Sequence, residues 1–149
     1  GYLTCMAALD NDPALDTGAY LEYSSQIQAA CPWYPPTDAS SFHYDDPEQA
    51  AAAAESLLMG FNVMRNIKEA EDNSPVSKVT KDAPPFLIIH GTDDHTVPFE
   101  QSEILYEKLT KNGCDVKFIE LEGADHADMQ FFQDELWNRI IEFFDEKLK

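Results

Sequence analysis

The chain has 149 residues and 44% of them are hydrophobic, so it can bury a core and is too apolar to be intrinsically disordered. Acidic residues number 28 against 10 basic ones, which gives a formal net charge of -18. This charge would repel phosphates and argues against a nucleic-acid or anionic-membrane partner. The longest apolar runs are far too short to span a bilayer.

Three cysteines, Cys5, Cys31 and Cys114, form an odd set without metal-ligand spacing. Such a set is typical of free, buried thiols in a reducing compartment. No signal peptide is recognisable at the start of the chain. We therefore expect a cytoplasmic protein. The chain starts without methionine and inside helical sequence, which indicates that its true N-terminus lies upstream.

The first 36 residues predict one helix and one strand. Residues 2–9 are apolar and tolerate a helix, which the sequence Asp-Asn-Asp-Pro at 10–13 ends. The short apolar run Ile27–Cys31 precedes a proline-rich turn and is expected to form a buried strand.

Residues 37–82 differ in character and predict a helical insertion that resembles a lid. Asp46 is placed to cap a helix, with Pro47 in its first turn and Gln49 in capping-box position. Gly60 is expected to end this helix. A second, more polar segment follows it.

The remaining sequence alternates strands and helices. Residues 84–91 are continuously apolar, as in a parallel strand covered on both faces, and residues 114–123 alternate like a second strand. A helix is expected over residues 98–113. A long amphipathic helix is expected over residues 128–149, and its apolar positions are Phe132, Leu136, Ile140 and Phe144.

This order predicts a single α/β domain over residues 1–149. Strands that alternate with helices form parallel sheets through right-handed crossovers. We expect about three parallel strands with flanking helices.

The topology places two polar loops side by side. The loops 91–98 and 122–127 both follow the carboxyl ends of strands, and neighbouring strands lie only about 5 Å apart. An aspartate in the first loop can therefore reach His126 in the second. An imidazole oriented by a carboxylate is the general base that activates a nucleophile.

The sequence "FLIIHGTDDHTVPFEQSEILYEKL", followed by "VKFIELEGADHAD" and a terminal helix, resembles the α/β-hydrolase esterases and lipases. The most similar group is the bacterial type with acetyl- and feruloyl-esterase-like members. The family pattern H-G-x-x-D-x-x-V-P makes Asp94 the catalytic acid, and the loop before the last helix makes His126 the base. The resemblance implies a partial α/β-hydrolase fold and a Ser-Asp-His mechanism.

The family's G-x-S-x-G motif around the nucleophile is absent from this chain. The segment "GYLTCMAAL" resembles the helix after that motif, and Gly1 stands for the second of its two closing glycines. The serine would then precede Gly1 by about three residues. We expect the chain to be the carboxyl-terminal half of an esterase, inactive by itself.

Other polar residues receive lesser roles. His90 is expected to form local hydrogen bonds and His95 to be solvated. A metal site formed by these two with Asp93 or Asp94 is disfavoured, because no fourth ligand is evident. Trp33, Tyr34, His43 and Val97 are candidate substrate-binding residues.

The sequence thus predicts a carboxylic-ester hydrolase without a cofactor, acting on a small-molecule or carbohydrate-linked ester. Its expected partner is the amino-terminal half of the same protein. Two alternatives remain open. One is a serine peptidase or a dienelactone-type hydrolase on the same fold. The other is a non-catalytic fragment that associates with itself through the exposed edge of strand 27–31.

Overall fold

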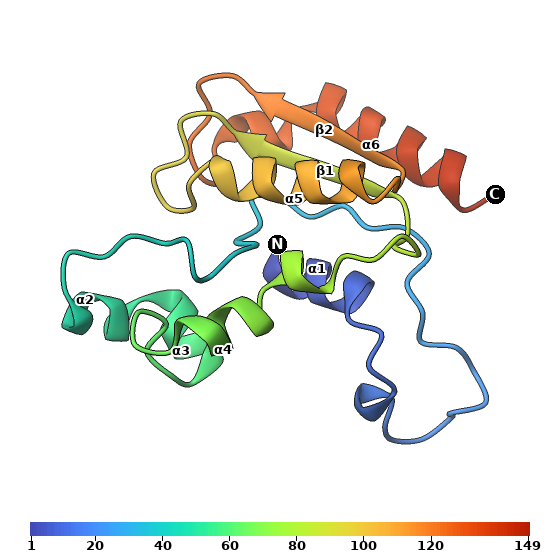
Figure 1. Ribbon diagram of the computed structural model, residues 1–149. Coiled ribbons are helices and arrows are strands. Elements are labelled where there is room, and N and C mark those ends of the chain that lie inside the picture. The colour runs from blue at the N-terminus through green and yellow to red at the C-terminus, as the bar shows by residue number, and fades with distance from the viewer.

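The computed structural model describes all residues 1–149 and shows a two-stranded parallel sheet between helices, with a helical subdomain at one side (Figure 1). The strands are β1 (Phe86–Gly91) and β2 (Val116–Leu121). The α-helices are α1 (Tyr2–Leu9), α2 (Pro47–Ala52), α3 (Ala54–Met59), α4 (Ile67–Asp72), α5 (Glu100–Lys111) and α6 (Asp134–Lys147). Short 3-10 turns occupy Pro13–Leu15, Pro75–Lys78 and Met129–Phe132.

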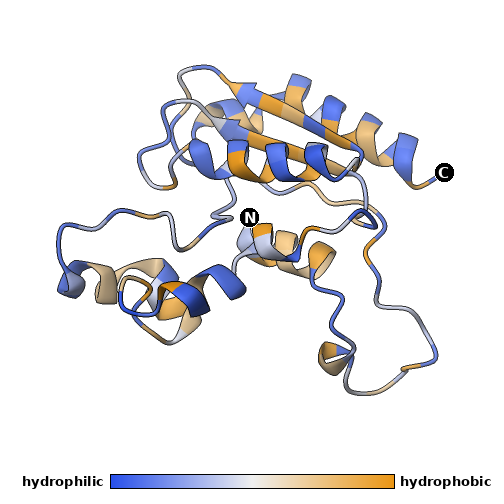
Figure 2. Cartoon of the chain, in the orientation of Figure 1, coloured by the Kyte–Doolittle hydropathy of each residue, from blue (hydrophilic) through white to orange (hydrophobic).

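Strand β1 is the centre of the core, and all six of its residues are buried. Successive side chains of a strand point to opposite faces. Phe86 and Ile88 accordingly pack in one cluster with residues of α1 and α5, whereas Leu87 and Ile89 pack in a second cluster with residues of α6. Figure 2 shows this apolar strand between α5 and α6. The continuous apolar run at 86–89 is thus explained by burial on both faces.

Strands β1 and β2 pair in parallel from Phe86 opposite Val116 to Gly91 opposite Leu121. Helix α5 forms the crossover between them, as the alternating pattern predicts. Because the strands are parallel and in register, both end at the same rim of the sheet. The loops after Gly91 and Leu121 therefore start side by side.

The prediction of a continuous strand over residues 27–31 was wrong in its extent. Pairing with β1 occurs instead at two isolated bridges, Ala30 opposite Phe86 and Trp33 opposite Ile89. Pro32 lies between the bridges and has no N–H, although its carbonyl oxygen accepts a hydrogen bond from Ile89 N at 3.1 Å. The missing donor interrupts the ladder between the two bridges.

The insertion is helical, but its first predicted helix is divided in two. Asp46 accepts hydrogen bonds from the amides of Glu48 and Gln49, as a capping residue should. Ala53 is extended and separates α2 from α3, and Gly60 ends α3 with a left-handed φ of 76°. The subdomain has its own small core of Ala39, Val63 and Ala70.

The last helix starts at Asp134, later than the pattern predicts. An extended residue, Gln133, separates it from a preceding 3-10 turn and changes the helical phase. As a result Phe131 is buried and Phe132 is 54% exposed, and the buried stripe of the helix is Leu136, Ile140 and Phe143. No helix of the chain combines the length and the apolar character that crossing a membrane requires.

Gly91 allows the two rim loops to approach each other. A Cβ atom at this position would lie 2.2 Å from the carbonyl oxygen of Ala124, well inside van der Waals contact. The same carbonyl oxygen accepts a hydrogen bond from Asp93 N at 3.1 Å. The close contact between the loops thus requires glycine at the end of β1.

We expect Gly91→Ala to lower the free energy of unfolding by about 3 kcal/mol, the upper end of the range for overpacking. The new Cβ atom would clash with the backbone of Ala124, which cannot move aside as a side chain can. Gly60→Ala is the matched control, since nothing lies within 4 Å of its Cβ position. That control should cost about 1 kcal/mol, from its left-handed backbone alone. Urea denaturation measures both, and equal losses would contradict the steric argument.

Candidate active site

Asp94 and His126 meet across the two rim loops. Their side chains are joined by a hydrogen bond of 2.8 Å between His126 Nδ1 and Asp94 Oδ2. The carboxylate side chain is completely buried, and the imidazole side chain is 28% exposed. An acceptor at Nδ1 places the proton on that nitrogen and leaves Nε2 free to accept one. Nε2 has no hydrogen-bond partner within the chain, so it is available as a base.

The Asp94 carboxylate is held by backbone donors as well. Its Oδ1 accepts hydrogen bonds from the amides of Thr96 and Val97, each at 2.8 Å. These are the donors of an Asx-type turn, which the short aspartate side chain forms with the residues that follow it. The turn fixes the rotamer of Asp94 and leaves Oδ2 directed at His126.

A second hydrogen-bonded link joins the loops one residue away. Asp125 Oδ1 accepts from the amide of His95 at 2.9 Å and from the amide of His126 at 2.7 Å. The hydrogen bond from the His95 amide is the largest cause of a lowered pKa of the Asp125 carboxyl, and that from the His126 amide is the next. No motif in the sequence predicts a role for Asp125. Its position directly before His126 would have been the only available signal.

His90 lies behind Asp94, at the end of β1, and its side chain is completely buried. Its Nδ1 lies 2.7 Å from Ser102 Oγ, and its Nε2 lies 3.0 Å from the carbonyl oxygen of Val97. The same Nε2 is 3.2 Å from Asp94 Oδ2. Burial lowers the pKa of His90 from its usual 6.5, so the ring is neutral at pH 7. Local hydrogen bonds were predicted for this residue, but not its contact with Asp94.

Tyr34 covers one side of the His126 ring. The two ring centroids are 4.0 Å apart, and Tyr34 has a left-handed φ of 35°, which is uncommon for a residue with a side chain. Its neighbour Trp33 points elsewhere. Trp33 packs against Phe131 and Trp137, with centroids 5.5 and 5.6 Å away.

A cleft of about 1120 Å³ opens in front of Asp94 and His126. Tyr34, His43 and Val97 line it, together with Phe42 and Tyr44 of the insertion, but Trp33 does not. Trp33, also predicted to bind substrate, lies outside this cleft, because the change of direction between residues 33 and 34 places it in the aromatic cluster instead. No lysine or arginine lines the cleft, whereas Glu55 and Glu100 do.

The insertion is attached to the sheet by Gln101, a buried residue in the first turn of α5. Its Oε1 accepts hydrogen bonds from the amides of Thr37 and Asp38, at 2.9 and 2.8 Å. Its Nε2 donates to Ser41 Oγ at 2.8 Å. No sequence pattern indicates this role, since a glutamine on a polar helix is normally solvated.

The match with known families identifies the chain. A family model described as BD-FAE matches residues 1–109. This chain belongs to the BD-FAE family.

Curated relatives carry esterase names. Over 131 residues the chain is 34% identical to Esterase LipQ of Mycobacterium tuberculosis, and over 129 residues it is 30% identical to Probable carboxylic ester hydrolase LipM of the same organism. Each alignment covers 85% of this chain and 30% of the relative. The BD-FAE chain thus spans about a third of the length of the curated relatives it matches.

Solved structures show the same fold, that of the α/β-hydrolases. A truncated carbohydrate esterase from gut microbiota superposes with a TM-score of 0.82 at 26% identity, over 97% of this chain and 55% of that one. An esterase from Thermogutta terrifontis gives a TM-score of 0.64 at 25% identity, over 95% of this chain and 48% of that one. The expected partial α/β-hydrolase fold is confirmed.

No serine, threonine or cysteine side chain of the BD-FAE chain forms a hydrogen bond with His126. Ser41 lines the cleft, but its hydroxyl donates to the Asp38 carbonyl at 2.9 Å and accepts from Gln101. Burial raises the pKa of Cys5 to about 12 and that of Cys31 to about 11, so neither forms a thiolate near pH 7. The His95 side chain is exposed and pairs with Asp125 at 3.4 Å, whereas that of His90 is buried, and neither belongs to a group of three potential metal ligands.

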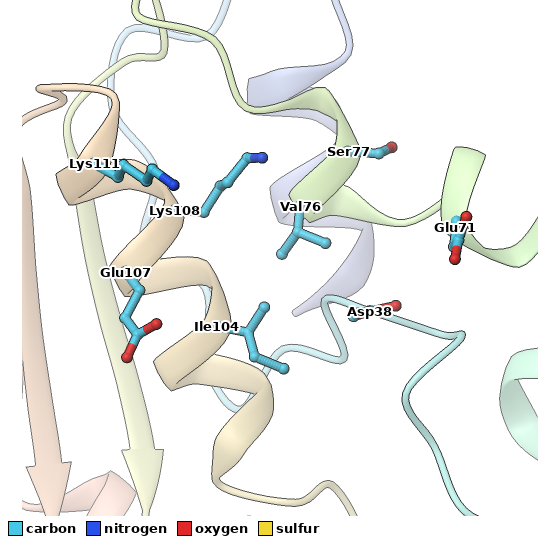
Figure 3. A pocket seen from close by; sticks show the side chains of 8 residues that line it. All are labelled: Asp38, Glu71, Val76, Ser77, Ile104, Glu107, Lys108 and Lys111. Atoms are coloured by element: carbon cyan, nitrogen blue, oxygen red, sulfur yellow. The ribbon is translucent and has the colours of Figure 1, made fainter.

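A second groove lies apart from this chemistry, between α5 and the insertion (Figure 3). Ile104, Lys108 and Lys111 of α5 face Val76 and Ser77 across it. Neither Asp94 nor His126 reaches this groove. The candidate active site of the BD-FAE chain is therefore the cleft at the sheet rim.

His90 should make folding of the BD-FAE chain sensitive to mild acid. Its pKa is lower in the folded state, so its stabilising effect is complete above pH 6.5 and is lost as pH falls towards the folded-state value. Urea denaturation from pH 7 to 5 should show a steeper loss for the wild type than for His90→Gln. Carboxylates affect both proteins equally, and parallel curves would contradict a neutral His90.

Asp125→Ala should loosen the link between the loops, because the amides of His95 and His126 lose their acceptor. We expect faster hydrogen exchange at both amides and a smaller increase in Asp125→Asn, which retains an oxygen. Asp93→Ala is the control, since the Asp93 side chain makes no hydrogen bond to the other loop. NMR-detected exchange measures the effect, and unchanged rates at both amides would rule out the link.

Proposed function

We propose that this chain supplies the acid and the base of a Ser-Asp-His carboxylic-ester hydrolase. The observation that carries the proposal is the 2.8 Å bond between Asp94 and His126, with the other imidazole nitrogen of His126 unpartnered at the cleft. The esterase names of the relatives support ester substrates and favour them over peptides.

In this mechanism, His126 Nε2 removes the proton of a serine hydroxyl as its oxygen attacks the ester carbonyl. The imidazolium is stabilised by the Asp94 carboxylate through Nδ1–H. It then protonates the departing alcohol as the carbon–oxygen bond breaks and leaves an acyl-serine. Water activated by the same nitrogen releases the acid and restores the serine.

We propose that the serine precedes Gly1 in the intact protein. Gly1 supports this position, because a Cβ atom there would lie 2.4 Å from Pro35 Cα and 2.6 Å from the Trp33 carbonyl oxygen. The start of α1 therefore has to approach the segment next to the catalytic histidine very closely. Gly1 and Tyr2 also line the cleft that contains His126.

An apolar groove supports docking of the amino-terminal half. It runs between α1, the segment 27–33 and α6, and nine of its ten lining residues are hydrophobic. Ile27 and Trp137 are 37% and 44% exposed there. The proposed partner is a further part of the same protein. Self-association through the same edge is the alternative, and it would appear as a dimer in light scattering.

The insertion, residues 37–82, is proposed to be a lid that shapes the ester pocket. Phe42, His43 and Tyr44 reach the cleft from its first loop, opposite Val97 and Tyr34. A small-molecule or carbohydrate-linked ester is the proposed substrate. The resemblance to a solved carbohydrate esterase supports the second class.

The 149-residue chain alone should not hydrolyse p-nitrophenyl acetate above the rate in buffer, because it lacks the nucleophile. The intact protein should hydrolyse it, and Asp94→Asn should reduce its kcat by about 10⁴-fold, the typical effect of a wrong histidine tautomer. Asp93→Asn is the matched control and should keep most of the activity. Hydrolysis by the isolated chain that Asp94→Asn abolishes would overturn the proposal for the nucleophile.

A further inference from the structure

We infer that His90 is a positioning residue, which holds the Asp94 carboxylate in the orientation that His126 requires. This inference rests on the proposed function for its consequence in catalysis. The contact between His90 and Asp94 itself does not depend on the proposed function. Asp94 Oδ2 lies between two imidazoles. His126 Nδ1 is hydrogen-bonded to it at 2.8 Å on the cleft side, and His90 Nε2, which is hydrogen-bonded to the Val97 carbonyl, lies 3.2 Å from it on the core side.

The tautomer of His90 follows from its neighbours. The Val97 carbonyl oxygen, 3.0 Å from Nε2, can only accept a hydrogen bond, so Nε2 must carry the proton. Nδ1 is then the acceptor, and the Ser102 hydroxyl, 2.7 Å away, donates to it. The ring is neutral because burial lowers its pKa. His90 therefore presents one N–H donor at a fixed place, close to both the Val97 carbonyl and Asp94 Oδ2.

The strand explains why this donor is behind the acid. His90 follows Phe86 and Ile88 on the face of β1 that α5 covers, and its ring packs on Phe99 with centroids 5.6 Å apart. The chain then reverses direction in the loop after β1, which brings Asp94 Oδ2 to 3.2 Å from His90 Nε2. Because Asp94 is buried and no lysine or arginine lines the cleft, only N–H donors compensate its charge.

Removal of this donor has a specific consequence. Oδ2 would keep a single partner, His126. The amides of Thr96 and Val97 would still hold Oδ1, but Oδ2 would shift about this anchor towards the space left by the imidazole. His126 would then lose its fixed acceptor and would sample the tautomer with the proton on Nε2. That tautomer cannot remove a proton from a hydroxyl.

Ser102 and Gln101 add a structural link to this arrangement. Ser102 fixes the His90 tautomer, and the adjacent Gln101 binds the root of the insertion through the amides of Thr37 and Asp38. One turn of α5 therefore positions both the catalytic acid and the loop that lines the cleft. We assign these residues to positioning, because neither contacts His126.

The decisive experiment is the tautomer of His126 in the 149-residue chain at pH 7.5, read from imidazole ¹⁵N shifts. The wild type should show the Nδ1–H tautomer. His90→Leu should reduce its share severalfold in favour of Nε2–H. His90→Gln should restore it, because the Gln side-chain amide reaches the position of Nε2, whereas the shorter Asn amide in His90→Asn ends near Nδ1 and should not.

His43→Gln is the matched control, since His43 also lines the cleft but makes no contact with Asp94, and it should leave the His126 tautomer unchanged. If the Gln and Asn variants have the same share of the Nδ1–H tautomer of His126, the inference is overturned. This comparison holds even if His90→Leu does not fold. A wild-type His126 with Nε2–H would overturn it as well.

In the intact protein, His90→Leu should lower the kcat for p-nitrophenyl acetate by about 10- to 100-fold, the usual effect of a residue that orients a catalytic group. KM should stay unchanged, because the cleft is not altered. If the tautomer responds as expected but no variant affects ester hydrolysis, the proposed function fails and the positioning of His126 by His90 stands. If hydrolysis depends on Asp94 but the tautomer does not respond to His90, only this inference fails.

Discussion

The buried carboxylate of Asp94 is the constraint on which the rim of this sheet depends. A charge without solvent has to be surrounded by donors, and no cationic side chain is present to serve. Two backbone amides and the His126 imidazole donate hydrogen bonds to it, and His90 Nε2 lies 3.2 Å away, so the groups around it come from three places in the chain. β1, its following loop and the loop after β2 must therefore meet at one point.

The close approach of backbone at Gly91 and Ala124 makes this meeting possible. In-register parallel strands start both loops at the same level, and the absence of a Cβ at Gly91 lets them touch. Asp125 then links the loops at the surface while Asp94 links them in the interior. Asp125 precedes His126 in the chain and binds its backbone amide, whereas Asp94 binds its imidazole ring.

Helix α5 connects the acid to the insertion. Its outer face is polar, but its first turn also carries two buried residues, Gln101 and Ser102, whose side chains bind other segments of the chain. The insertion in turn places aromatic residues over the cleft. The shape of the cleft and the position of Asp94 thus share one support.

The sequence by itself determined the α/β order, the two principal strands and the meeting of an aspartate of the first rim loop with His126, and the resemblance to the α/β-hydrolases singled out Asp94. Hydrophobic periodicity and strand parity are local properties, and parallel pairing brings equivalent strand ends together. Tertiary structure alone decided the broken pairing at Pro32, the phase of α6 after Gln133, and the direction of Trp33. It also decided the roles of His90, Ser102 and Gln101, because a polar residue reveals its partner only when the chain returns to it.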